Sequence, residues 1–191
     1  MKRKSILSII VFAILICSCQ NITTNASAKN VESNTLSSNA APQDYYFGVF
    51  AEKWDASASA FVGHAFIGIG KGTPLTCDIN GNETEIWGFY PQKKIDGAKS
   101  YWFGPVDGKI ASDIFTKIDR QFFIRIDFGD YLKIQLKVEE WKKKQYQLTR
   151  NDCVSFLIDV CNTLPKRIVV PKRETTDLPD DYVKKIINQN K

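Results

Sequence analysis

TRNDCVSFLIDVC, residues 149–161, is the stretch that decides the fold of this chain. Its apolar side chains recur at the three- and four-residue spacing of one helix face: Val154, Leu157, Ile158 and Cys161. Asn151 precedes this run and belongs to the residue types that cap helix N-termini. The pattern therefore predicts a helix with Cys153 in its first turn, where backbone N–H groups and the helix dipole favour an anion.

Upstream of this helix the sequence predicts strands. Residues 44–51 and 121–127 are rich in aromatic and β-branched side chains. Residues 61–70, FVGHAFIGIG, are apolar at odd and even positions alike, which predicts a strand covered on both faces. Residues 84–90 alternate and stop at Pro91, as the return strand of a hairpin does. Residues 92–120 contain Gly, Asp and Lys and are expected to form a loop.

Two further helices are expected, one from residue 131 to about 145 and a short one over 180–188. The alternating Leu132, Ile134, Leu136 and Val138 also permit a strand at the start of the first. Strands followed by helices indicate an α+β fold. The aromatic side chains Tyr45, Tyr46, Trp87 and Trp102 are expected mostly in its core, with lining of a groove as the alternative for one or two of them.

The N-terminal residues have the features of an export signal. Lys2, Arg3 and Lys4 precede an apolar run, residues 6–16, which is shorter than the roughly 20 residues that span a bilayer. The residues that follow, ICSC at 16–19, resemble a bacterial lipobox, which implies that Cys19 becomes the lipidated first residue. An ordinary cleaved signal peptide is the alternative. We therefore expect a lipoprotein signal peptide over residues 1–18. The lipid on Cys19 is then expected to anchor the protein to a membrane of the bacterial cell envelope, facing outside the cytoplasm.

Two segments follow the predicted signal. Residues 19–43 are rich in Asn, Thr, Ser and Ala and lack aromatics, which predicts a disordered tether. Residues 44–191 are long enough for one domain with a core of its own. Without residues 1–18 the chain has 23 basic and 21 acidic residues, so its charge gives no reason to expect nucleic-acid binding. The oligomeric state has no signal in the sequence.

The predicted domain contains three cysteines: Cys77, Cys153 and Cys161. An odd number in an oxidising compartment leaves at least one thiol unpaired. Cys161 is expected in the core, and a disulfide between Cys77 and Cys161 is compatible with the sequence. His64 is the one histidine of the chain and no Cys-x-x-Cys pair exists, so neither a metal site nor a cofactor is expected.

Three motifs follow one another along the domain: GHAFI at residues 63–67, WGFYP at 87–91 and YQLTRNDCVSF at 146–156. In this order, with the histidine strand before the cysteine helix, they resemble the permuted branch of the NlpC/P60 papain-like superfamily over residues 45–171. The resemblance implies a circularly permuted papain-like fold, with an antiparallel sheet packed against the nucleophile helix. It also implies Cys153 as nucleophile and His64 as base. The family's Asn-Cys pair is here interrupted by Asp152, whose carboxylate disfavours a neighbouring thiolate.

Cysteine–histidine sites usually include a third, polar residue that orients the imidazole. If residues 61–71 pair antiparallel with residues 83–92, His64 lies opposite Tyr90, and Gln92 is its diagonal neighbour on the same face. Glu85 then lies on the other face. We expect Gln92 in this role, with Tyr90 as the alternative; a register slip by one residue brings Glu85 to the histidine face instead.

The resemblance and the predicted anchor imply a cell-envelope cysteine hydrolase that cleaves an amide bond, most simply in peptidoglycan peptides. A lipid-directed thiol acyltransferase or esterase acting on an acyl ester is a second hypothesis. A non-enzymatic envelope lipoprotein that retains the fold is the third. The separation between the Cys153 sulfur and the His64 ring discriminates, because a distance beyond about 6 Å excludes catalysis by this pair.

Overall fold

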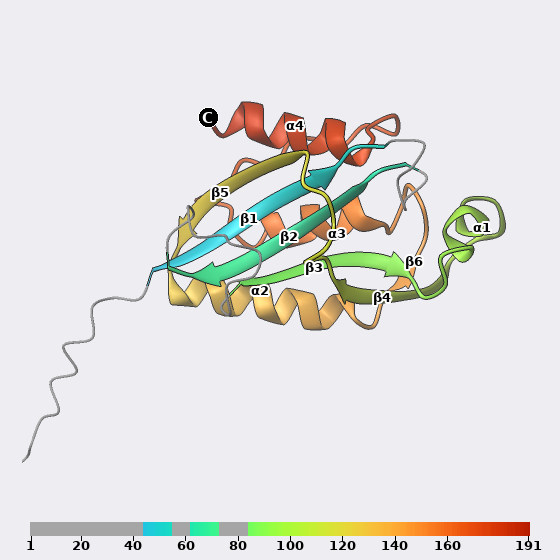
Figure 1. Ribbon diagram of the computed structural model, residues 1–191, viewed down its shortest axis with the longest axis horizontal. Helices are drawn as coiled ribbons and strands as arrows, with labels where there is room; N and C mark the ends of the chain where they lie inside the picture. The colour runs from blue at the N-terminus through green and yellow to red at the C-terminus, as the bar shows by residue number, and fades with distance from the viewer. Residues whose placement is uncertain (1–43, 55–61, 73–83) are drawn as a thin grey trace, which may run out of the picture. The chain divides into compact units, whose positions relative to one another are not determined.

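The computed structural model describes residues 44–54, 62–72 and 84–191, so the predicted lipidation site Cys19 and also Cys77 lie outside the described residues. Six strands form one sheet in the order β5-β1-β2-β3-β4-β6, and every neighbouring pair is antiparallel (Figure 1). The strands are β1 (Tyr45–Glu52), β2 (His64–Lys71), β3 (Thr84–Pro91), β4 (Val106–Ser112), β5 (Arg120–Ile126) and β6 (Gln145–Tyr146). The helices are α1 (Asp96–Phe103), α2 (Phe128–Trp141), α3 (Cys153–Cys161) and α4 (Pro179–Gln189).

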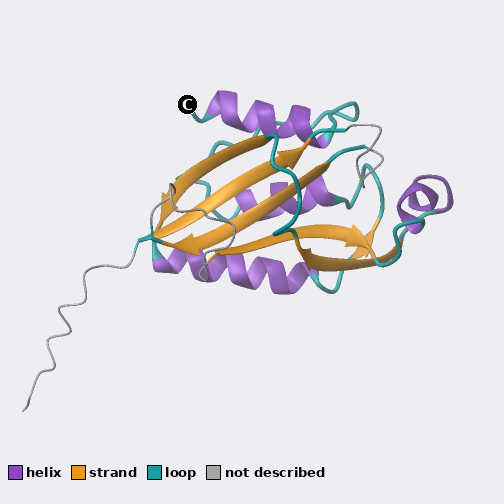
Figure 2. Cartoon of the chain, viewed as in Figure 1, coloured by secondary structure: helices purple, strands orange, loops and turns teal. Residues whose placement is uncertain are grey.

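The predicted α+β class is therefore confirmed, and the alternation of the central strands explains how the layers pack. One face of β1 and β2 carries Phe47, Val49 and Ile67, which share the main core with side chains of α2, α3 and α4. The opposite face carries a smaller cluster of Phe50, Phe66 and Ile86. The prediction that the strand around His64 is covered on both faces is thus confirmed. Helix α1 stands apart from the other three helices, at one end of the sheet (Figure 2).

The segment between β3 and β5 departs from the expected loop, because it contains α1 and β4. Strand β4 is only half-buried and includes Gly108, so its sequence lacks the apolar alternation of a core strand. Trp102, expected in the core, is 77% exposed because α1 does not pack into the main core. Within the described residues, no helix has both the length and the apolar character needed to cross a bilayer.

Two helix starts also differ from the expected positions. Helix α2 begins at Phe128, three residues earlier than expected, because the Asp127 carboxylate accepts the N–H of Asp130 as an N-cap. Helix α3 is capped by Asp152 rather than by Asn151, since the Asp152 carboxylate accepts the N–H of Ser155. Cys153 is nevertheless in the first turn of its helix, as predicted.

Candidate active site

Strands β2 and β3 pair in the register that the sequence predicts, with Phe66 opposite Gly88 and Gly70 opposite Thr84. Continued to the start of β2, this register sets His64 opposite Tyr90. The two rings stack with centroids 4.3 Å apart, and Phe66 lies on the His64 ring at 5.6 Å. His64 is 4% exposed, so its ring orientation is set by packing.

The hydrogen-bond partner of this imidazole is Asp113, which directly follows β4. The distance from His64 Nε2 to Asp113 Oδ2 is 3.3 Å. The other carboxylate oxygen, Oδ1, accepts hydrogen bonds from the Thr116 hydroxyl at 2.8 Å and from the Tyr90 hydroxyl. The backbone N–H of Asp113 donates to the Ile86 carbonyl at 3.1 Å, which ties the carboxylate to the sheet. Asp113 is therefore a buried acid held by three groups and directed at the histidine.

Asp113, and not the predicted Gln92, is the polar side chain that is hydrogen-bonded to the imidazole. Gln92 is exposed, its backbone N–H donates to the Asp107 carbonyl at 2.7 Å, and within the described residues it has no hydrogen bond to His64. Tyr90 contacts the ring by stacking and reaches the network through Asp113, while Glu85 is exposed and lies opposite Ile69. Asp113 was missed because residues 92–120 were expected to form a loop, and β4 is what brings it back to β3.

The imidazole interacts with Cys153 as well as with Asp113. Burial lowers the pKa of His64, but hydrogen bonds with Asp113 and Cys153 outweigh burial and leave the pKa at about 9. This raised pKa favours the imidazolium form at neutral pH. Cys153 is 4% exposed and is, with Asp113, one of the two groups that raise the pKa of the imidazole, so the two side chains are electrostatically coupled.

Gly88 leaves the space in which the His64 imidazole and the Asp113 carboxylate meet. A Cβ at residue 88 would lie 2.1 Å from Asp113 Oδ2 and 2.3 Å from His64 Nε2. Ordinary van der Waals contact begins near 3.4 Å, so no side chain fits there without moving the pair. Glycine at this strand position therefore allows the close approach of the acid and the imidazole.

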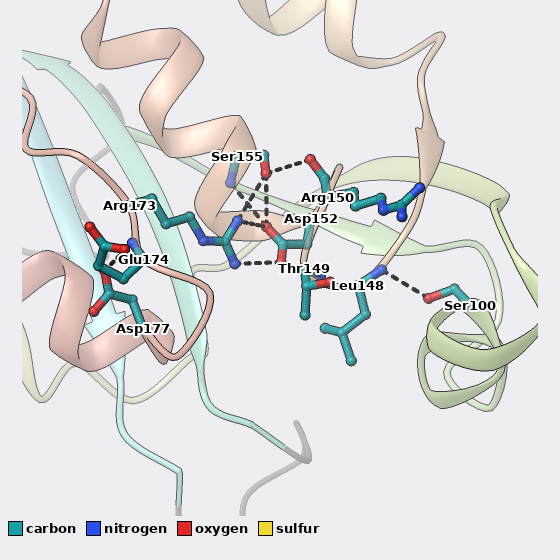
Figure 3. A network of polar contacts seen from close by, with 9 residues as sticks. All are labelled: Ser100, Leu148, Thr149, Arg150, Asp152, Ser155, Arg173, Glu174 and Asp177. Carbon is teal, nitrogen blue, oxygen red and sulfur yellow. Dashed lines mark hydrogen bonds and ion pairs between the residues drawn. The ribbon is translucent and has the colours of Figure 1, made fainter.

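Asp152 has a charged partner of its own, Arg173 (Figure 3). The two form a bidentate pair with both N···O distances at 2.7 Å, and Asp152 is 2% exposed. Burial raises the pKa of Asp152, but Arg173 and the N–H groups of Ser155 and Thr149 outweigh burial and hold the pKa below its usual range. The carboxylate charge next to Cys153 is thus neutralised, which answers the objection that the sequence raised.

Arg173 is also electrostatically coupled to the nucleophile candidate. Burial lowers the pKa of Arg173, but its bonds to Asp152 and its attraction to Cys153 raise it overall. Arg173 lies 21 residues from Asp152 along the chain, and no local pattern identified it.

The loop before α3 is held in an unusual conformation. Thr149 has φ of 70°, a left-handed value that a β-branched residue rarely adopts. Its N–H donates to Asp152 Oδ2 at 2.9 Å, and the Gln147 and Asn151 backbones hydrogen-bond across the loop. Asp152 therefore holds both this loop and the first turn of α3, and backbone strain of this kind concentrates at functional sites.

The second free thiol, Cys161, belongs to the core. It is completely buried, and burial raises its pKa, so it is an unreactive packing residue as expected. Its thiol is free, and Cys77, the other residue of the possible disulfide, lies outside the described residues. Among the residues that the structure describes, no three His, Cys, Asp or Glu side chains gather closely enough to hold a metal ion.

Comparisons with known proteins add little to this geometry. No family model matches the chain, and a search of curated proteins found no match. Among solved structures, the crystal structure of a type VI secretion system effector, TseH, is similar with a TM-score of 0.46 and 14% sequence identity, covering 78% of this chain and 90% of that one. A likeness this distant carries no argument about function.

Proposed function

We propose that this chain is a cysteine hydrolase that cleaves an amide bond, on a domain of the circularly permuted papain-like class. Cys153 is the nucleophile, His64 the acid in the first half of the reaction and the base in the second, and Asp113 the positioning residue for the imidazole. One observation carries the proposal: the buried His64 ring interacts with Asp113 and with Cys153, and Cys153 is the first residue of a helix.

In the first half of the reaction the Cys153 sulfur attacks the carbonyl carbon of the substrate. The C–N bond then breaks, and the leaving amine takes the proton of the His64 imidazolium, which leaves a thioester on Cys153. In the second half, neutral His64 accepts a proton from water as the water oxygen attacks the thioester carbonyl. The C–S bond breaks, the acid product leaves, and the thiolate and imidazolium are restored.

The first turn of α3 supplies a site for the oxyanion of each tetrahedral intermediate. The first N–H groups of a helix lack intrahelical acceptors. Here the N–H of Ser155 is taken by the Asp152 carboxylate and that of Phe156 by the Asp152 carbonyl. The N–H groups of Cys153 and Val154 remain, next to the sulfur, and donors in this position stabilise the developing negative charge.

We propose peptidoglycan peptides as the substrate because the predicted lipid on Cys19 and the tether of residues 19–43 would hold the domain near the cell wall. Incorporation of a fatty-acid analogue by the parent chain and not by Cys19→Ala tests the anchor. Digestion of purified wall material, followed by counting new amino groups, tests the activity.

The digestion has a matched pair of variants. Cys153→Ala is expected to release no amino groups, whereas Cys161→Ala removes the other free thiol of the same helix and is expected to retain activity. Equal release by the parent and by Cys153→Ala would exclude the proposed nucleophile.

One observation favours a second substrate class, the acyl ester of a membrane lipid. Helix α1 exposes aromatic side chains, and its residue Ser100 is hydrogen-bonded to Leu148 in the loop before Cys153. Mass spectrometry after incubation with phospholipid vesicles distinguishes this class: an acyl adduct on Cys153 that is absent in Cys153→Ala supports it, and cleavage of wall peptides without an adduct excludes it.

A further inference from the structure

Helix α1 and the residues just before it expose an apolar surface of unusual density. Four large side chains within nine residues are more than half exposed: Ile95 at 68%, Tyr101 at 52%, Trp102 at 77% and Phe103 at 86%. Single exposed apolar residues need no explanation, but a cluster of this kind marks an interaction site. Helix α1 projects beyond the ends of β3 and β4, so the cluster lies on a protrusion (Figure 1).

The charge around the cluster indicates what it contacts. Lys93 and Lys94 are exposed, and within the described part of the chain neither belongs to an ion pair. Lys99 is paired with Asp96 at 3.6 Å, so the surface has a net positive charge from Lys93 and Lys94. Lysines beside Trp, Tyr and Phe form the combination that lies at a bilayer interface, with rings at headgroup level and ammonium groups on anionic lipids.

We propose that this surface, defined by Lys93, Lys94, Ile95, Tyr101, Trp102 and Phe103, is a membrane-docking surface that binds anionic phospholipid headgroups. It inserts its aromatic rings at the interface and acts in addition to the proposed lipid anchor. The docking does not depend on catalysis by Cys153.

The docking surface is connected to the candidate active site by one buried residue. Ser100 is completely buried, its hydroxyl donates to the Gly97 carbonyl at 2.7 Å, and the hydroxyl oxygen accepts the Leu148 N–H at 3.1 Å (Figure 3). Leu148 lies five residues before Cys153, in the loop that Asp152 holds. A docked α1 therefore fixes this loop relative to the bilayer.

Fluorescence quenching by brominated lipids tests the proposal in the full chain. The chain is reconstituted with vesicles of phosphatidylglycerol and phosphatidylcholine, and quenching is compared in the parent, Trp102→Phe and Trp54→Phe. We expect Trp102→Phe to lose most of the quenched signal, whereas Trp54→Phe, which removes a tryptophan that is 57% exposed outside the docking surface, retains it. Because the readout is insertion of one side chain, an N-terminal anchor alone does not produce it.

Three further variants keep the Trp102 reporter. We expect quenching to be reduced by Phe103→Ser and by the double variant Lys93→Gln with Lys94→Gln. In the double variant, each lysine that is removed is expected to weaken the docking equilibrium about five-fold. Phe115→Ser, which removes a side chain 94% exposed beyond the opposite end of β4, is expected to change nothing.

Quenching that is equal in the parent and in Trp102→Phe overturns the proposal, as does quenching that is the same in phosphatidylcholine alone. Cys153→Ala is expected to dock normally, so failure of docking and failure of the proposed hydrolysis are separate results.

Discussion

Replacing Gly88 with alanine tests the geometry of the candidate site at one atom. The new Cβ would lie 2.1 Å from Asp113 Oδ2, 2.3 Å from His64 Nε2 and 2.9 Å from Tyr90 Cε2. The first two atoms belong to the hydrogen-bonded pair and are each more than 1 Å inside ordinary contact distance, so the acid and the imidazole must separate. Overpacking of a buried site costs about 1–3 kcal/mol of unfolding free energy, and a displacement of about 1 Å in a catalytic group costs about 100-fold in rate.

Two measurements follow this variant without knowledge of the substrate: urea unfolding, and the rate at which iodoacetamide alkylates Cys153 at neutral pH. We expect Gly88→Ala to be less stable and to be alkylated more slowly, because the imidazolium no longer supports the thiolate. Gly97→Ala is the matched control. Its Cβ would meet only Pro91 Cγ at 3.4 Å, and alanine in a helix gains up to about 1 kcal/mol over glycine. Alkylation of Gly88→Ala at the parent rate would refute the reasoning.

Three other predictions concern the charges around the site. Arg173→Gln leaves the Asp152 carboxylate buried without its partner, so its free energy of unfolding in urea is expected to fall by about 3–5 kcal/mol. Adding Asp152→Asn is expected to recover part of that loss. An unchanged unfolding midpoint in Arg173→Gln contradicts the pairing. Asp113→Asn removes a charge that raises the pKa of His64. The alkaline limb of the pH–rate profile for hydrolysis, expected near pH 9 in the parent, should therefore move to lower pH in this variant. A limb that does not move counts against Asp113. The pKa of His64 is raised from 6.5 to about 9 on folding, so protonation of His64 stabilises the folded state by up to roughly 3 kcal/mol. This contribution is complete below pH 6.5 and is lost as the pH rises through 9. A free energy of unfolding that is flat across that range argues against the shift.

The sequence predicts the histidine strand and the cysteine helix because their signals are local. Residues 61–70 are apolar on both faces and Pro91 ends the return strand, and the observed pairing of these two strands places Tyr90 against His64. The three- and four-residue spacing after Cys153 gives helix α3 to within a residue of its start. Strand and helix periodicity reflects burial of one face, so it is present in the chain itself.

The other half of the site depends on contacts that local patterns do not encode. Asp113 reaches His64 only because β4 pairs with β3. Strand β4 has too few apolar residues for the sequence pattern to predict a strand there. Gln92 is the diagonal neighbour of His64 in this register, yet its side chain is exposed. The inference that Asp152 opposes a thiolate considered one charge and its neighbour, whereas Arg173 comes from a distant segment and neutralises that charge.

The most direct test of the Cys153–His64–Asp113 site is an NMR titration of the imidazole, because His64 is the one histidine in the chain and gives a single ring signal. We predict a midpoint at about pH 9 for the parent, and a lower midpoint in both Cys153→Ala and Asp113→Asn, since each residue raises the pKa of the ring. A parent midpoint near the ordinary value of 6.5, or a midpoint that neither variant lowers, would contradict the proposed site.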